Sequence, residues 1–422
     1  MVASTDIKFY VHSNNNAPQL QNAFGSMIDV LDACLVNGIS LGLVSSLTST
    51  GTTVTAVFST AHNLMQYQVL KITGANEVEY NGEHRILTVP NATSVTFQLG
   101  SAPSTTTATG TITASLPPLG WEKPFSSANV SGGGKAAYRS KNLLLPSRPF
   151  LRVVDELDPS YTATYAKYAK VGIVEDMTDI DTMLGVQAPY DTANPDKNWV
   201  GSGSGTSVIN GWARWYYARA ALLPSNGSDM GLPADGNRVW LVVGNGDFFY
   251  VLPGVRPSSA ELHKTPPYGF GAFDSLIHND NANTFLASNL DLGSVSKNTL
   301  LTSFTGTAYS TESKLLLLHR GYAQNGSSEI ANCYSLGCSA NTMYSGRLDY
   351  IGSISLSGLS PFAPVYIQEN VLRGVLPSLN WLFQNRPFLN NQAIENSNSM
   401  YIASDVVIGG SLGQVIFYLG DL

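Results

Sequence analysis

The sequence predicts a mainly β protein, with a small N-terminal β-barrel or β-sandwich module, a larger antiparallel β-sandwich domain and one N-terminal helix. Only 13% of its 422 residues are charged, against about a quarter in an ordinary globular protein, and 39 are glycine. In the stretch 238–252, RVWLVVGNGDFFYVL, two apolar runs flank an Asn-Gly pair. Asn-Gly tolerates the positive φ of a tight turn, so we expect a hairpin covered on both faces.

Residues 1–44 are expected to form a strand at 7–11 and one amphipathic helix. Apolar residues recur at three- and four-residue steps through 20–36, and Asn37-Gly38 is a typical helix stop. An isolated helix in a β-rich chain can be an attachment element, and it can equally close one end of a sandwich. The candidate attachment residues are Leu20, Phe24, Met27, Leu31 and Leu35.

Short strands separated by Gly, Asn and Pro-Asn turns predict a compact β module over residues 45–114. His62 and His84 fall at the edges of its strands, where we expect solvated or capping side chains. Residues 115–134 contain three prolines and a run of three glycines, so they are expected to be a linker. Trp121 would dock this linker against one of the domains.

The larger β-sandwich domain is expected over residues 135–422, with a last strand at 415–419. It contains the densest group of carboxylates in the chain, namely Glu175, Asp176, Asp179 and Asp181. Such a group could bind Ca²⁺, or Asp176 and Asp179 could serve a glycosidase. Because the DxDxDG pattern is absent, we favour a polar loop whose Asp side chains cap turns and a short helix near 177–184.

Aromatic residues are concentrated in the expected strand that follows a Gly-Ser loop. Trp212, Trp215 and Tyr217 could face a ligand and stack on the sugar rings of a host polysaccharide. Packing in the core of a sandwich explains the same residues without a ligand, and we favour that interpretation.

Three cysteines are too few for a disulfide framework. Cys34 lies in the apolar helical run and is expected to be a buried thiol, whereas Cys333 and Cys338 could pair across a loop or stay reduced. No histidine lies near the latter two, which disfavours a metal site.

Several classes of function are disfavoured. A net charge of −7 argues against nucleic acid as a partner, and no apolar run is long enough to insert into a membrane. The start of the chain lacks the pattern of a secretory signal. No nucleophile-elbow, P-loop, zinc-protease or dinucleotide motif occurs, so we expect no enzymatic activity and no cofactor.

Three segments resemble a family of structural proteins from tailed-bacteriophage virions. Residues 61–100, with a "KITGA" strand, a Tyr-Asn-Gly turn and a "SVTF" strand, are similar to a small β-module that recurs in such proteins. In the family, a helix with LDACLVNG precedes the module and a Gly-Trp-Glu-Lys segment leads into a larger β domain, as residues 27–38 and 119–140 do here. The resemblance covers residues 1–250, with weaker echoes to the end.

The resemblance implies a structural component of a virion, assembled in the host cytoplasm, and lends the chain no catalytic residues. The part expected is a tail fibre or a tail- or collar-associated protein. Its partners would be copies of itself, other virion proteins near the tail adaptor, nozzle or portal, and a host surface polysaccharide. Two alternatives remain open: a tail protein that binds or cleaves glycans, and a capsid decoration protein.

Overall fold

The computed structural model is mainly β, which confirms the predicted fold class. In the described part, α1 (Ser26–Leu31) runs into a π-helical turn, η1 (Asp32–Asn37), and a 3-10 turn, η2, spans Val78–Tyr80. The structure describes residues 2–204, 208–220, 229–257, 267–291, 296–298, 315–324, 329–334, 362–382, 386–408 and 411–422.

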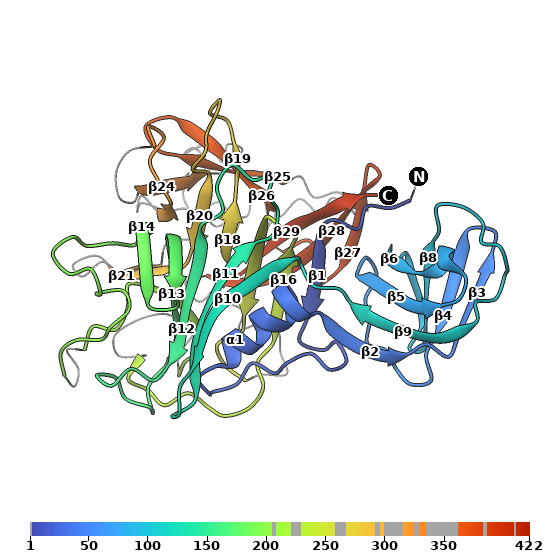
Figure 1. Ribbon diagram of the computed structural model, residues 1–422, viewed down its shortest axis with the longest axis horizontal. Helices are drawn as coiled ribbons and strands as arrows, with labels where there is room; N and C mark the ends of the chain where they lie inside the picture. Colours follow the sequence, from blue (N-terminus) through green and yellow to red (C-terminus); the bar gives the residue numbers. More distant parts are fainter. Residues whose placement is uncertain are drawn as a thin grey trace.

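The small module lies at one end of the molecule and consists of two four-stranded sheets (Figure 1). The strands of the first sheet are, in spatial order, β2 (Ile39–Leu43), β9 (Gly110–Leu116), β5 (Val69–Ala75) and β6 (Gly82–Arg85). Those of the second are β3 (Ser46–Thr50), β4 (Thr53–Val57), β8 (Ser94–Gln98) and β7 (Thr88–Asn91). Because β2 pairs with β9, the module extends slightly beyond the predicted 45–114 at both ends.

The larger part is built from two more sheets. The eight described strands of one are β10 (Trp121–Ala128), β11 (Gly133–Ser140), β12 (Phe150–Glu156), β13 (Lys167–Asp179), β15 (Ala213–Ala218), β21 (Asn289–Asp291) and β22 (Ser296–Asn298), with β14 (Thr182–Ala188) paired to β13. The thirteen of the other are β1 (Lys8–Val11), β16 (Trp240–Gly244), β17 (Phe248–Pro253), β18 (Tyr268–Ala272), β20 (Thr284–Ala287), β23 (Leu315–Leu318), β24 (Glu329–Tyr334), β25 (Phe362–Gln368), β26 (Leu372–Leu382), β29 (Ser411–Asp421), β28 (Ser399–Ile408) and β27 (Ala393–Asn396), with β19 (Asp274–Ser275) paired to β26.

The central hairpin predicted from residues 238–252 is confirmed as β16 and β17, and every residue of both strands is buried. The two faces of the hairpin pack into two different hydrophobic cores. Trp240 and Val242 pack in the core shared with the eight-stranded sheet, α1 and the module, whereas Leu241 and Val243 pack with the C-terminal strands. A strand without apolar-polar alternation is what burial on both faces requires.

The turn of this hairpin differs from the expectation. Neither Asn245 nor Gly246 has a positive φ. The Asn245 side chain instead accepts hydrogen bonds from the backbone N–H groups of Asp247 and Phe248, at 2.9 and 3.3 Å. The turn is therefore held by an Asn side chain that replaces a backbone acceptor.

Both ends of the chain join the thirteen-stranded sheet. The predicted first strand is β1, which pairs antiparallel with β16, and the predicted last strand forms part of β29, which pairs with β26 and β28. The predicted N-terminal strand is thus an edge of the large sheet.

The module is fastened to the larger part by Arg85, at the end of β6. Its guanidinium, 1% exposed, donates to the carbonyl oxygens of Ser4, Tyr67, Ile7 and Leu419 at 2.6 to 2.9 Å. Burial lowers the pKa of Arg85 to about 10. We call this contact, which joins the module to both ends of the chain, the Arg85 joint.

The prediction of a linker over 115–134 is wrong, because most of this segment belongs to the hairpin formed by β10 and β11. Two of its glycines, Gly133 and Gly134, allow close backbone packing, as described below for Gly133. Trp121 does dock: its ring meets Phe249 edge-on at 5.3 Å and its indole N–H donates to the Asn245 carbonyl at 2.8 Å.

Candidate functional site

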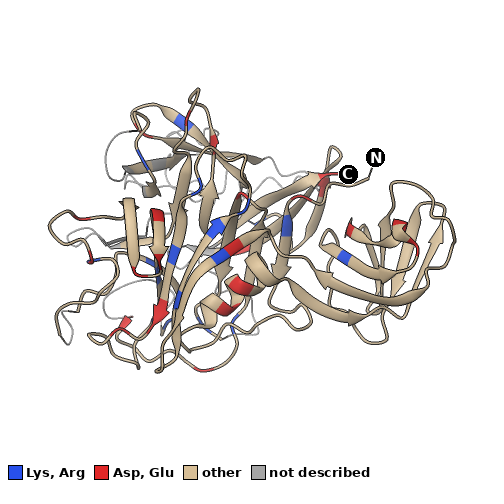
Figure 2. Cartoon of the chain, in the orientation of Figure 1, with Lys and Arg blue, Asp and Glu red and all other residues tan. Residues whose placement is uncertain are grey.

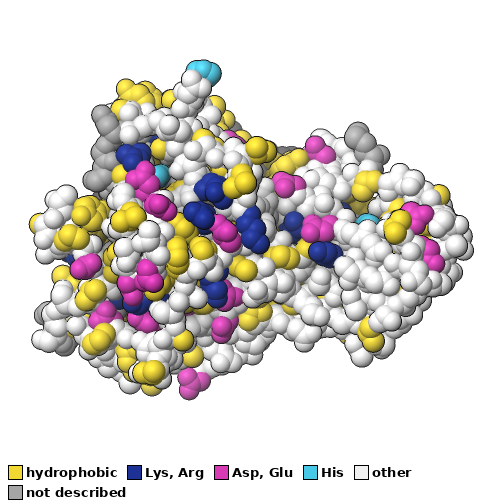
Figure 3. All heavy atoms as spheres, viewed as in Figure 1, with side chains coloured by type: hydrophobic (Ala, Val, Ile, Leu, Met, Phe, Trp, Pro, Cys, Tyr) yellow, Lys and Arg dark blue, Asp and Glu magenta, His cyan; other side chains and the backbone are white. Residues whose placement is uncertain are grey.

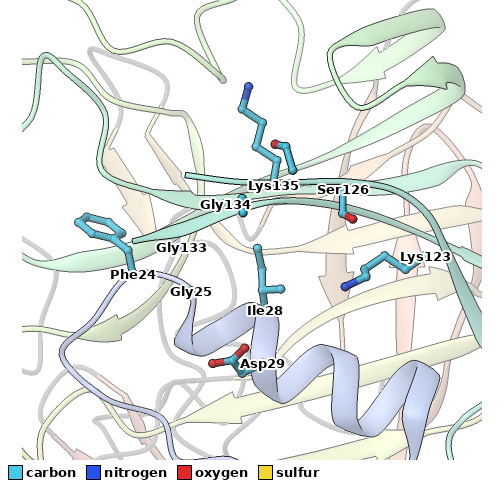
Figure 4. Close-up of a pocket in the computed structure, with 11 residues that line it drawn as sticks. Phe24, Gly25, Ile28, Asp29, Lys123, Ser126, Gly133, Gly134 and Lys135 are labelled. Atoms are coloured by element: carbon cyan, nitrogen blue, oxygen red, sulfur yellow. The ribbon is translucent and has the colours of Figure 1, made fainter. Parts of the chain in front are cut away.

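An open groove of about 410 Å³ lies between α1 and the β10–β11 hairpin (Figure 4). We call it the α1–β10 groove. Figure 4 shows Ile28 rising from the helix toward the strands, whereas the Lys135 side chain projects from the hairpin away from the helix. The groove is lined by Phe24, Gly25, Ile28, Asp29, Lys123, Ser126, Ser127, Ala128, Gly133, Gly134 and Lys135.

Glycines allow the start of α1 to lie against the hairpin. A Cβ on Gly25 would come within 2.9 Å of the Gly133 Cα, and a Cβ on Gly133 would come within 2.0 Å of the Asp155 carbonyl oxygen. Both residues also have positive φ, at 91° and 74°, which side chains disfavour. The glycine run between β10 and β11 therefore makes one wall of the groove.

A buried carboxylate holds the start of α1 in place. Asp155, on β12, is 0% exposed and accepts hydrogen bonds from the Met27 backbone N–H at 3.1 Å and from the Tyr217 hydroxyl at 2.6 Å. Burial raises the pKa of Asp155 to about 6, against the lowering effect of these hydrogen bonds. This contact caps a helix that has no side-chain cap of its own.

Opposite charges lie side by side along α1, β10 and β11 (Figure 2). Asp32 accepts hydrogen bonds from the Lys123 ammonium and from the Tyr138 hydroxyl, the latter at 2.7 Å. Asp29, one turn earlier, is exposed, and the structure describes no ion pair for it. Partial desolvation and the neighbouring Asp32 carboxylate raise the pKa of Asp29, and the Lys123 charge opposes them to a smaller degree.

The outer edge of β10 has no partner strand in the described part of the chain. Among the described strands, β10 pairs with β11 alone and is the last strand on that side of its sheet. The Asn129 N–H donates to the Gly133 carbonyl, and alternation in an antiparallel ladder then turns the N–H and C=O groups of Ser126 and Ala128 away from β11. These residues also line the groove, so its β10 wall carries backbone groups that have no hydrogen-bond partner among the described residues.

The candidate attachment residues do not form an exposed surface. Leu20, Met27, Leu31 and Leu35 are at most 1% exposed and belong to the shared core, so their use as a docking face is corrected. The reason is that α1 closes the space between the sheets, as the alternative interpretation expected. Only Phe24, which is half-buried, lines the groove.

The predicted helix is also shorter than expected. Residues 21–25 are not helical, and Leu20 forms a β-bridge with Arg238 at the start of the central hairpin. The end at Asn37-Gly38 is confirmed, with a φ of 76° at Gly38.

The candidate ligand-facing aromatics lie inside the protein, as the favoured interpretation held. Trp215 and Tyr217 are 0% exposed and Trp212 is 7% exposed. The Trp215 indole donates to the Ala287 carbonyl at 2.9 Å and its ring stacks on Tyr268. The exposed face that sugar stacking needs is absent from these three residues, so the ligand-facing interpretation is corrected.

The acidic group lies on a hairpin, β13–β14, and not on a capped helix near 177–184, which corrects that expectation. Its carboxylates have partners: Glu175 pairs with Arg320, and Asp181 pairs with Lys135 and Arg152. Asp179 accepts the Asp181 N–H at 3.1 Å, which is the turn-capping role expected of it.

Asp176 accepts the Met177 N–H at 2.9 Å. In the part of the chain that the structure describes, no group of three or more His, Cys, Asp and Glu side chains is placed to hold a metal ion. No described helix is long and apolar enough to cross a membrane.

Cys34 is a buried thiol, as predicted, and Cys333 is buried in β24. Cys338 lies outside the described residues. The two histidines expected to be solvated or capping are not solvated, with 3% exposure for His62 and 8% for His84. His62 does have a capping role, since its Nδ1 accepts the Leu64 N–H at 2.9 Å, and both rings bond to backbone carbonyls.

Sequence reasoning missed the residues that organise the groove and the Arg85 joint. Asp155 precedes Glu156 and Asp158 in an acidic run, so nothing local marks it as buried. Arg85 lies in a strand that contains two other charged or titratable residues, Glu83 and His84. The sequence did offer one signal, the glycine run at 132–134. Such a run is typical of a flexible linker and also of close backbone packing, and the sequence alone does not distinguish the two.

The sequence was compared with protein-family models and with curated proteins. No protein-family model matches the chain, and no curated protein matches it.

Proposed function

We propose that this chain is a structural component of a tailed-phage virion that acts in the tail apparatus, as a fibre or a tail- or collar-associated protein, by assembly with neighbouring proteins. The observation that carries the proposal is the resemblance of residues 27–38, 61–100 and 119–140 to virion structural proteins. A non-enzymatic role fits the absence of catalytic motifs from the sequence.

The spatial relation of these segments supports the proposal. The Cys34 and Leu35 carbonyls of the first segment accept hydrogen bonds from the Leu119 and Gly120 N–H groups of the third, at 2.9 and 3.2 Å. Lys123 of the third segment pairs with Asp32 of the first. Two of the three segments that resemble the family therefore contact each other directly, which is expected if the resemblance reflects a shared architecture.

The surface is consistent with assembly. Most of the face shown in Figure 3 carries neither charged nor hydrophobic side chains, and apolar side chains are scattered over it. The Arg85 joint fastens the module to the larger part through four carbonyls, which suits a building block that must keep its shape. The buried aromatics and paired carboxylates give the glycan-cleaving alternative less support.

The decisive experiment is to locate and count this protein in purified phage particles by electron microscopy and quantitative mass spectrometry. A small symmetric set of copies at the tail is the expected result, because such assemblies are rings or trimers. Many copies covering the head would replace the tail proposal with decoration of the capsid. Absence from particles would overturn the structural function altogether.

The alternative of glycan cleavage is tested separately on the purified protein. Incubation with the capsular or surface polysaccharide of the host should leave polymer length unchanged in size-exclusion chromatography. Shortening of the polymer would contradict the proposed lack of enzymatic activity.

A further inference from the structure

We propose that the α1–β10 groove is the docking site for an extended segment of a neighbouring virion protein, which adds to the open edge of β10 and points a Lys or Arg side chain at Asp29. This inference rests on the proposed function and names the surface through which assembly would occur. It moves the attachment function from the buried apolar face of α1 to the opposite side of the same helix.

The open edge supplies the first argument. The Ser126 and Ala128 backbone groups point away from β11, and no described strand pairs with them. Edge strands with free N–H and C=O groups are templates for an added strand, which gains main-chain hydrogen bonds. A groove beside the edge gives the side chains of that strand room to enter.

The open part of the edge is short and has a defined limit. Pro124 has no N–H, and the register between β10 and β11 shifts between Glu122 and Phe125. Both features prevent a strand from continuing along β10 in that direction. The added segment therefore pairs with residues 126–128 alone, and its specificity must come from side chains in the groove.

The side chains of the added segment would contact two kinds of surface in the groove. Phe24 and Ile28, both half-buried, offer apolar area beside the open edge. Asp29 offers a carboxylate with no described ion pair, whereas the cations nearest to the groove are engaged, Lys123 by Asp32 and Lys135 by Asp181. The groove is therefore complementary to one apolar and one cationic residue on the incoming segment.

A second copy of β10 does not fit this description. In a symmetric contact, the β10 strands of two copies would pair with each other, and each groove would receive the exposed residues of the other strand. These are Pro124, Ser126, Ser127 and Ala128, none of which is a cation. The charge of Asp29 would stay without a partner, so the structure favours a different protein as the occupant.

The test uses particles assembled in host cells that supply variants of this chain to a phage lacking its gene. Ser126→Pro removes one outward N–H and leaves the bonds to β11 intact, and Asp29→Lys reverses the groove charge. Both are expected to lower incorporation into particles at least tenfold, as measured by mass spectrometry against another virion protein.

Each variant has a matched control. Ser126→Thr keeps the N–H, and Glu395→Lys reverses an exposed charge on β27, far from the groove in sequence and with no described ion pair. Both should incorporate like the wild type. Thermal unfolding of all four purified variants near the wild-type midpoint shows that loss of incorporation is not loss of folding.

Hydrogen exchange gives a readout that does not depend on variants. In the free protein the Ser126 and Ala128 amides should exchange fast, and in purified particles they should be protected at least tenfold. Protection in the free protein that appears together with dimers would overturn the choice of partner in favour of a second copy.

The two proposals can fail separately. If the wild type is present in tail structures while Ser126→Pro and Asp29→Lys incorporate normally, the docking site is wrong and the proposed function stands. If the wild type is absent from particles, the proposed function is wrong, and so is the proposal that a neighbouring virion protein binds in the groove.

Discussion

The Arg85 joint and the α1–β10 groove both lie where distant segments of the chain meet. They differ in whether their polar groups find hydrogen-bond or ion-pair partners within the described chain. At the joint, one guanidinium satisfies four carbonyls from three parts of the chain and is fully covered. At the groove, the outward groups of Ser126 and Ala128 and the carboxylate of Asp29 lack such partners among the described residues.

The difference indicates what each contact does. A buried polar group without a partner costs stability, so contacts that only hold a fold together are normally completed within the chain. The groove instead leaves backbone groups and a charge without described partners, beside walls fixed by glycines and a buried carboxylate, which is why we propose it as a docking site. Stability measurements should therefore separate the two regions.

The largest effect is expected at the joint. Arg85→Ala leaves four buried carbonyl oxygens without their donor, so we expect a loss of about 3–5 kcal/mol in the free energy of unfolding. Chemical denaturation followed by tryptophan fluorescence measures it. The control is Lys8→Ala, which removes a partly exposed ion pair with Glu83 and should cost no more than about 1 kcal/mol. Equal effects would show that the joint is not a special contact.

The next effect concerns the wall of the groove. Gly133→Ala combines a positive φ with a Cβ placed 2.0 Å from the Asp155 carbonyl oxygen, so we expect a loss of about 2–4 kcal/mol. Gly132→Ala also has a positive φ, at 102°, but its Cβ meets open space and should cost only about 1 kcal/mol. Similar losses in the two variants would mean that close packing against the hairpin contributes little.

A pH-dependent effect is expected from Asp155. Its folded-state pKa of about 6 lies above the ordinary value, so the folded state binds the proton more tightly than the unfolded state. The stability that Asp155 contributes is therefore complete below about pH 4 and is lost as the pH rises through about 6. Asp155→Asn stays neutral and lacks this loss.

Denaturation at several pH values tests this effect. The stability of the wild type relative to Asp155→Asn should fall by about 1–3 kcal/mol between about pH 4 and about pH 7. A difference that stays constant over this range would show that the carboxyl does not change its charge there. The Asn variant also tests whether the cap of α1 requires a carboxylate or only an acceptor.

The sequence predicted those parts of the fold that local chemistry determines. Apolar runs without alternation identified the doubly buried hairpin, and short strands with regular turns identified the module. The glycine run was misinterpreted because flexible linkers and close backbone contacts both favour glycine. The positions of Gly25 and of the Asp155 carbonyl, both distant in sequence, decide between them at Gly133.

The groove was partly foreseeable. The helix was predicted and proposed for attachment, but periodicity identifies its apolar face, which the sheets of the same chain cover. Which face stays open depends on long-range pairing, such as the bond from the Met27 N–H to Asp155. No pattern within the helix itself records that contact.

The smallest effect is expected at Asp29, and it bears most directly on the difference between the two regions. Asp29→Asn should change the free energy of unfolding of the isolated protein by no more than about 0.5 kcal/mol. The helix dipole favours the carboxylate in the first turn of α1, whereas desolvation and the charge of Asp32 disfavour it and raise the pKa of Asp29, so these effects oppose each other. Denaturation of the two proteins side by side measures the change. A loss above about 1 kcal/mol would mean that Asp29 stabilises the fold and that its charge is not open to a partner. A near-zero change together with impaired assembly would assign the charge to docking, because a residue that contributes nothing to the isolated chain can then act only through what it binds.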